Sequence, residues 1–139
     1  MCKVITFGIK KGGVGKSCTA YNLAGAIASK GMSVALIDTD TNESVASMVS
    51  DRNDLRKELK SKGADADSLP PHIMCIKKGP DETIEDDIEE LKRSNDYVII
   101  DTKGTENNAF KEAIVHSDVI YLPTGVSSID IKELVPTIE

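Results

Sequence analysis

The stretch GIKKGGVGKSCT, residues 8–19, decides the fold because it has the form of a loop that binds phosphate. It ends in GKS at positions 15–17, as the pattern G-x-x-x-x-G-K-[ST] requires. Lys10, however, stands where that pattern has its first glycine, and Lys11 follows it. The loop has therefore lost one glycine and gained two cations, and any account of the chain has to explain both changes.

The remaining residues of the loop keep the chemistry of phosphate binding. Gly12, Gly13 and Gly15 allow the backbone to turn its N–H groups toward an anion. A helix that begins directly after the loop adds its own N-terminal amides to the same site. Lys16 would then reach the β- and γ-phosphates of a nucleotide, and the Ser17 hydroxyl would bind Mg²⁺.

Apolar bursts alternate with helical patterns along the whole chain, which predicts an α/β fold. Parallel strands covered by helices on both faces have such near-continuous apolar runs. We expect strands at 3–9, 33–38, 72–76, 96–101 and 118–123, and helices at 16–31, 43–62, 80–94, 106–117 and from 128 onward. The helix at 43–62 has a candidate break near Ser50. No linker or repeat interrupts the pattern, so residues 1–139 are expected to form one P-loop domain.

Carboxylates follow two of the expected strands at the edge where the loop also lies. Asp101 ends the strand at 96–101, where it would hold Mg²⁺ through a water. Asp38 ends the strand at 33–38 and Asp40 follows two residues later, so their side chains lie on the same side of the extended chain. Two carboxylates would repel phosphates unless Mg²⁺ or water lies between, so one is expected to serve the metal and the other the attacking water. Acidic turns after strands are the alternative for each of them.

The composition of the chain argues against several classes of function. The net charge is −6 and aromatic residues make up 4% of the chain, which argues against a basic DNA footprint or a base-stacking surface. Cys2, Cys18 and Cys75 have no C-x-x-C spacing and are expected to be reduced thiols in a cytoplasmic protein. The sequence contains no membrane-spanning run of apolar residues and no signal peptide, so we expect no membrane association.

Four stretches together resemble one family, and they cover almost the whole chain. KGGVGKS is similar to the deviant Walker A motif of the ParA/MinD ATPases, which partition plasmids and chromosomes and position cell-division sites. VALIDTDTN resembles the family's second motif, DYVIIDTKGT its Walker B region, and VIYLPTGVSSID its next strand. The short plasmid-partition ParA proteins are the most similar type. The resemblance implies that the chain is the N-terminal part of a longer fold.

The resemblance implies a role for each site residue. Lys11 is implied to cross a dimer interface and touch the partner's nucleotide, as an arginine finger does. Lys11, Lys16 and Asp40 would be catalytic, with Asp40 positioning water. Mg²⁺ would be held by Ser17, Asp38 and Asp101. ATP would contact the loop and the start of its helix through Lys11, Gly12, Gly13, Val14, Gly15, Lys16, Ser17 and Cys18.

Some positions depart from the family pattern. Lys10 is either a further phosphate cation or a solvent-facing side chain. Cys18 replaces a hydroxyl residue, and Thr41 and Lys103 each replace a proline, which puts the rate of hydrolysis in question. Residues 103–105 are either a mobile segment beside the γ-phosphate, with Gly104 permitting close approach, or a plain turn.

The resulting expectation is a bacterial or archaeal ATPase that forms a homodimer on ATP and acts in plasmid or chromosome segregation. Its partner would be a centromere-binding protein of the ParB type, and it would associate with the nucleoid through non-specific DNA contacts made by residues outside this chain. One alternative is an ATPase that positions a protein complex. Another is a module that binds nucleotide without appreciable turnover.

Overall fold

The computed structural model describes residues 1–8, 16–42, 44–104 and 107–121. The loop at 9–15 and the helix expected from 128 lie outside the described residues. Within them, strands and α-helices alternate as the sequence predicts. The elements are β1 (Lys3–Phe7), α1 (Lys16–Ser29), β2 (Val34–Asp38), α2 (Ser44–Ser61), the short 3-10 helix η1 (Ala66–Ser68), β3 (Met74–Lys77), α3 (Glu85–Ser94), β4 (Tyr97–Asp101), α4 (Asn108–His116) and β5 (Val119–Tyr121).

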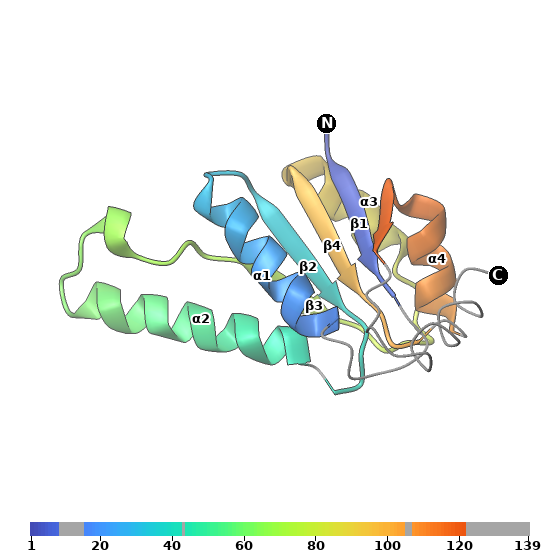
Figure 1. Ribbon diagram of the computed structural model, residues 1–139, viewed down its shortest axis with the longest axis horizontal. Helices are drawn as coiled ribbons and strands as arrows, with labels where there is room; N and C mark the ends of the chain where they lie inside the picture. The colour runs from blue at the N-terminus through green and yellow to red at the C-terminus, as the bar shows by residue number, and fades with distance from the viewer. Residues whose placement is uncertain (9–15, 43, 105–106, 122–139) are drawn as a thin grey trace, which may run out of the picture.

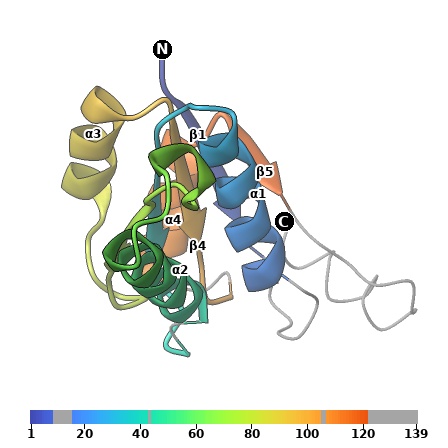
Figure 2. The same cartoon turned by 90° about the vertical axis from the view of Figure 1, so that its left-hand side faces the viewer.

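The strands form a single parallel sheet in the order β3-β2-β4-β1-β5. Helices α1 and α2 cover one face and α3 and α4 the other, as Figures 1 and 2 show. The expected fold class, a parallel sheet with helices on both faces, is confirmed. The order also brings β1, β4 and β2 together at the centre, so their carboxyl ends lie side by side.

Each face of the sheet has its own apolar core because successive strand residues point to opposite faces. The core under α1 and α2 contains Phe7, Leu36 and Ile99, and the core under α3 and α4 contains Val4, Ile37 and Ile100. Ile84, Ile88 and Leu91 form the buried stripe that the sequence predicts for the acidic helix. All strand residues of β2 are buried, as expected for a central parallel strand.

Helix α2 is one continuous helix, so the break expected near Ser50 is absent. The residues after Ser50 are mostly good helix formers, and these sustain the helix beyond the sheet. Its first half packs against the sheet through the buried Val45 and Val49, and Asn53 adds two hydrogen bonds to the backbone of Ile73, whereas Leu55 is 49% exposed. The second half projects as an arm (Figure 1). None of the helices in the described ranges is both long and apolar enough to span a bilayer.

Helix α3 begins at Glu85 rather than at residue 80, because a side chain from α4 holds the preceding loop. The Glu112 carboxylate accepts hydrogen bonds from the Thr83 hydroxyl at 2.7 Å and from the Ile84 N–H at 2.9 Å. The N–H groups just before α3 are therefore satisfied from outside the helix. This tertiary contact has no signal in the local sequence.

Other boundaries shift by a few residues, as helix and strand ends commonly do. The first strand ends at Phe7, and the third runs from Met74 to Lys77 instead of 72–76. Helix α4 starts at Asn108 because the Asn107 side chain caps it, accepting a 2.8 Å hydrogen bond from the Phe110 N–H.

Gly8 supplies a prediction, since it closes β1 against the ring of Phe110. A Cβ at position 8 would lie 2.4 Å from the ring's Cε2 atom and 3.1 Å from the Thr102 hydroxyl. We expect Gly8→Ala to lower the free energy of unfolding by about 1–3 kcal/mol, because the ring has to move. Urea titration measures the change.

Gly25→Ala is the matched control, because its Cβ would meet only the Arg52 guanidinium at an ordinary 3.5 Å. Within α1 this change should be neutral or stabilise by up to about 1 kcal/mol. Equal effects of the two substitutions would contradict the close approach at Gly8.

Candidate functional site at the carboxyl edge of the sheet

Two buried carboxylates end neighbouring strands at the same level of the sheet. Asp38 on β2 is the register partner of Asp101 on β4, and Asp101 is in turn the partner of Phe7 on β1. Asp38 is 1% exposed and Asp101 is fully buried. The parallel arrangement therefore brings together the residues that the sequence placed after separate strands.

Helix α1 delivers the motif serine to this edge. The Ser17 hydroxyl donates a hydrogen bond of 2.9 Å to Oδ2 of Asp101, across 84 positions of sequence. Ser17 is the second residue of α1, so the helix N-terminus faces the carboxyl end of β4. The serine of the Walker A motif and the aspartate of the Walker B motif thus meet, as the sequence predicted.

Asp38 makes structural hydrogen bonds with both of its carboxylate oxygens. Oδ2 accepts from the Ala46 N–H in the first turn of α2 at 2.9 Å, and Oδ1 accepts from the Asp40 N–H at 3.0 Å. A carboxylate at this position caps α2 and complements its dipole. Burial raises the pKa of Asp38, opposed by these two hydrogen bonds and reinforced by the negative charges of Asp101 and Asp40.

Asp40 lies at the start of the turn between β2 and α2 and is partly exposed. Its carboxylate accepts a 3.0 Å hydrogen bond from the Asn42 N–H, which shapes the turn. Asp38 and Asp40 therefore differ in accessibility. The more open Asp40 suits the expected water-positioning role, and the buried Asp38 suits a supporting one.

Of the remaining residues that the sequence singled out, Cys18 and Gly104 lie in the described part of the chain and the phosphate loop lies outside it. Cys18 is exposed on α1, where its sulfur accepts from the Asn22 amide at 3.5 Å. Gly104 has φ of 63°, a backbone conformation that favours glycine, and a Cβ there would meet no protein atom within 4 Å. The loop residues 10–15 lie outside the described part, as does the side chain of Lys16.

The donor set at this edge fits Mg²⁺. The Ser17 hydroxyl and the Asp101 carboxylate are hard oxygen donors within one hydrogen-bond length of each other. Mg²⁺ prefers such ligands and usually keeps several waters, with one or two protein groups and substrate phosphates completing its shell. The described residues contain no group of three or more His, Cys, Asp or Glu that would hold a metal without a nucleotide.

Two threonines complete the site and were missed from the sequence. The Thr39 N–H and hydroxyl both donate to the Asp101 carbonyl, at 2.9 and 3.0 Å, and Thr102 donates in the same way to the Phe7 carbonyl, at 3.1 and 2.8 Å. These paired bonds hold the strand ends in register where the carboxylates lie. The repeated Asp-Thr pair at the two strand ends was the available signal.

Comparison of the sequence with known protein families finds a match to a family of ATPases. The family described as ATPase MipZ matches residues 3–139. The ParA protein of Rhizobium radiobacter is 26% identical over 127 residues, which cover 91% of this chain and 50% of ParA. The chain spans about half the length of the curated relatives it matches.

Solved structures show the same fold. A plasmid partition protein from Borrelia burgdorferi bound to AMPPNP superposes with a TM-score of 0.70 at 24% identity, covering 97% of this chain and 68% of that protein. The ParA of pNOB8 bound to nonspecific DNA gives 0.74 at 18% identity, covering 99% and 59%. At these identities the likeness establishes a ParA/MinD-like P-loop ATPase fold.

The raised pKa of Asp38 predicts a pH dependence of stability without metal. Between the unfolded pKa of about 3.9 and the higher folded pKa, the folded chain binds the proton more tightly than the unfolded chain. The contribution of Asp38 is therefore full below this window and is lost as pH rises through it. Asp38→Asn lacks this loss, so its stability relative to wild type should rise with pH.

Urea titrations of both proteins in EDTA, from pH 4 to 8, measure the difference. Taking the difference cancels the titration of carboxylates that do not interact with Asp38, which leaves Asp38 and its neighbours Asp40 and Asp101. A difference that stays constant across the window would contradict a raised pKa at Asp38.

Proposed function

Because the chain belongs to the MipZ family of ATPases, within the ParA/MinD group, we propose that it binds and hydrolyses ATP with Mg²⁺ and dimerises when ATP is bound. One observation carries the proposal: the Ser17 hydroxyl lies 2.9 Å from the Asp101 carboxylate at the start of α1. The sequence directly before that helix is a phosphate-loop motif, so a bound nucleotide would lie next to these two oxygens.

Each residue at the edge then has a task. Ser17 supplies a direct oxygen ligand for Mg²⁺, and Asp101, which already accepts the serine hydrogen bond, holds one of its waters. Bound Mg²⁺ would neutralise charge on the β- and γ-phosphates. Asp38 supports this shell from behind while it caps α2, and Asp40, at the open end of the turn, orients the attacking water.

The loop residues complete the proposal on the strength of sequence. Gly12, Gly13 and Gly15 would cradle the phosphates, with Val14 and Cys18 beside them, and Lys16 would bind the β- and γ-oxygens. Lys11 would reach the nucleotide of the partner subunit and offset transition-state charge there. ATP would thus join two subunits, and hydrolysis would release them.

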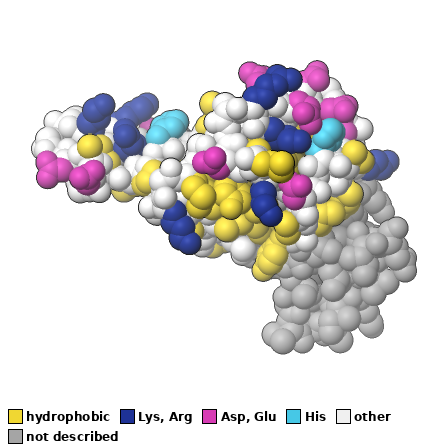
Figure 3. All heavy atoms as spheres, turned by 90° about the horizontal axis from the view of Figure 1, so that it is seen from above, with side chains coloured by type: hydrophobic (Ala, Val, Ile, Leu, Met, Phe, Trp, Pro, Cys, Tyr) yellow, Lys and Arg dark blue, Asp and Glu magenta, His cyan; other side chains and the backbone are white. Residues whose placement is uncertain are grey.

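We propose that the ATPase acts in partition and that its cargo is a plasmid or a chromosome. A ParB-type protein would stimulate ATP hydrolysis. The ParA relative and the plasmid partition structure support this choice. We propose that DNA contacts come from a local basic patch or from residues outside this chain, because its net charge is −6 and basic and acidic side chains are interspersed over the face that Figure 3 shows. Salt-sensitive, ATP-dependent binding to random duplex DNA separates this cargo from a protein complex.

The two lysines of the loop should separate binding from dimerisation. Lys16→Ala should weaken ATP binding by about 10- to 100-fold, since it removes a charged hydrogen bond to phosphate. Lys11→Ala should leave monomer affinity within about threefold and abolish ATP-dependent dimerisation. Titration of a fluorescent ATP analogue and analytical ultracentrifugation measure the two effects.

Lys10→Ala is the matched control for that pair, because it removes an adjacent charge. It should change neither property if Lys10 faces solvent. The in-trans role of Lys11 would be contradicted if Lys11→Ala and Lys16→Ala reduced nucleotide affinity alike.

Turnover tests the role of Asp40. Asp40→Ala should lower steady-state phosphate release by about a hundredfold, the usual effect of losing a group that positions or activates the nucleophile. Asp51→Ala, an exposed carboxylate on α2, is the control and should retain activity. Background release from wild type and Asp40→Ala alike would favour the module that binds nucleotide without turnover.

A further inference from the structure

Asp40, the residue that the proposed function assigns to the attacking water, lies two positions beyond the end of β2. It borders a hollow of about 270 Å³ that Thr41 and Gly79 also line, so water can reach it. A carboxylate on a turn orients water only if its backbone is held in place, because a misplacement of roughly 1 Å can cost about a hundredfold in rate. The residues that hold Asp40 therefore matter for the proposed reaction.

The chain enters this turn from a point that both neighbouring strands fix. On the β3 side, the Asp38 carbonyl accepts a hydrogen bond from the Lys78 N–H at 2.9 Å. On the β4 side, the Thr39 N–H and hydroxyl both donate to the Asp101 carbonyl, at 2.9 and 3.0 Å. Thr39 is fully buried, so its hydroxyl depends on this carbonyl rather than on bulk water.

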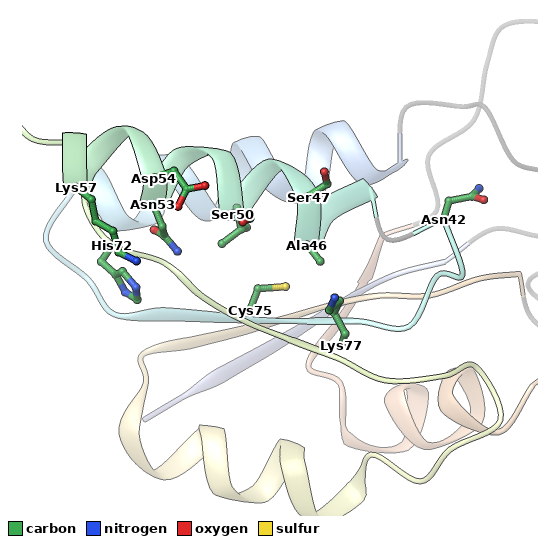
Figure 4. A pocket seen from close by; sticks show the side chains of 11 residues that line it. Asn42, Ala46, Ser47, Ser50, Asn53, Asp54, Lys57, His72, Cys75 and Lys77 are labelled. Carbon is green, nitrogen blue, oxygen red and sulfur yellow. The ribbon is translucent and has the colours of Figure 1, made fainter. Parts of the chain in front are cut away.

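The Asp38 carboxylate then holds the turn itself. Its Oδ1 accepts from the Asp40 N–H at 3.0 Å, and its Oδ2 accepts from the Ala46 N–H at 2.9 Å. The Asp40 carboxylate accepts in turn from the Asn42 N–H, at 3.0 Å. Figure 4 shows Asn42 on this turn and Ala46 in the first turn of α2. One buried carboxylate thus ties the backbone of Asp40 to the start of a helix.

We propose, on the basis of the proposed ATPase function, that Asp38 and Thr39 are positioning residues for Asp40 and that Asp38 is not a ligand of Mg²⁺. Asp38 is 1% exposed, and both of its oxygens accept N–H groups of the turn and of α2. The Ser17 hydroxyl, by contrast, bonds to Asp101, so the metal ligands gather at the end of β4. The tie through Asp38 also makes the direction of Asp40 depend on the position of α2.

Thr39 offers a matched pair of variants. Thr39→Val keeps the shape of the side chain and removes the hydroxyl, so it should lower kcat for ATP hydrolysis about tenfold and leave KM within about threefold. Thr39→Ser keeps the hydroxyl and should recover most of kcat. Equal loss of kcat in both variants, or a rise in KM at unchanged kcat, would overturn the positioning role of Thr39.

Asp38→Asn separates the two bonds of the carboxylate, because an asparagine side chain has a single acceptor oxygen. Asparagine caps helices as well as aspartate does, so this oxygen should stay on the Ala46 N–H. The amide nitrogen then faces the Asp40 N–H and cannot accept its hydrogen bond. In the protein without nucleotide, the Asp40 amide should therefore exchange about tenfold faster than in wild type, and the Ala46 amide within about threefold of it.

This exchange experiment is independent of the proposed ATPase. Absence of turnover in wild type would refute the ATPase proposal, and the exchange pattern would still show whether Asp38 holds the turn. Unchanged protection of the Asp40 amide in Asp38→Asn would overturn the inference.

A Mg²⁺ titration of turnover separates positioning from metal binding. Asp38→Asn should lower kcat about tenfold at an unchanged Mg²⁺ concentration for half-maximal rate, whereas Asp101→Asn should raise that concentration. In an Asp40→Ala background, Asp38→Asn should cause no further loss of kcat, because the group that it positions is gone. Recovery of kcat in Asp38→Asn by excess Mg²⁺, or additive losses in the double variant, would overturn the proposal.

Discussion

The register between β2 and β4 is the constraint on which the rest of the structure depends. It sets Asp38 opposite Asp101, with Thr39 and Thr102 bonding the neighbouring carbonyls so that the strand ends cannot slip. A one-residue shift would turn every side chain of a strand to the opposite face of the sheet and separate the two carboxylates. Both helices on one face of the sheet are then positioned from this pair, α1 through Ser17 and α2 through Ala46.

This arrangement joins stability and function at Asp38. A buried carboxylate beside two other acids raises the free energy of the folded chain, although two backbone N–H groups offset part of the cost. The same carboxylate caps α2, which lines one side of a groove beside β3 before its last turns leave the sheet. A cation bound at the proposed site would relieve the repulsion between these carboxylates, and this would favour binding of the cation by the folded domain.

Much of the fold was predictable because the strands are continuous apolar runs and the helices have clear buried stripes. The contact of Ser17 with Asp101 followed from two motifs and the rule that carboxyl ends of parallel strands share an edge. The starts of α3 and α4 did not follow, since Glu112 and Asn107 decide them through contacts that residue periodicity does not report. The sequence left a break near Ser50 open, whereas the helix formers that follow Ser50 sustain one continuous α2.

By itself the sequence determined the class of fold and the phosphate-loop motif, and it selected Ser17, Asp38, Asp40 and Asp101 as polar residues of one sheet edge, because local spacing encodes these directly. Only the tertiary structure decided that Asp38 caps α2 with Oδ2 and holds the following turn with Oδ1, while Asp40 remains partly exposed. Only it showed that Asn53 on α2 pairs with the backbone of Ile73, directly before β3. The reason is physical: hydrogen bonds between residues far apart in the chain depend on how elements pack, and packing has no local signature.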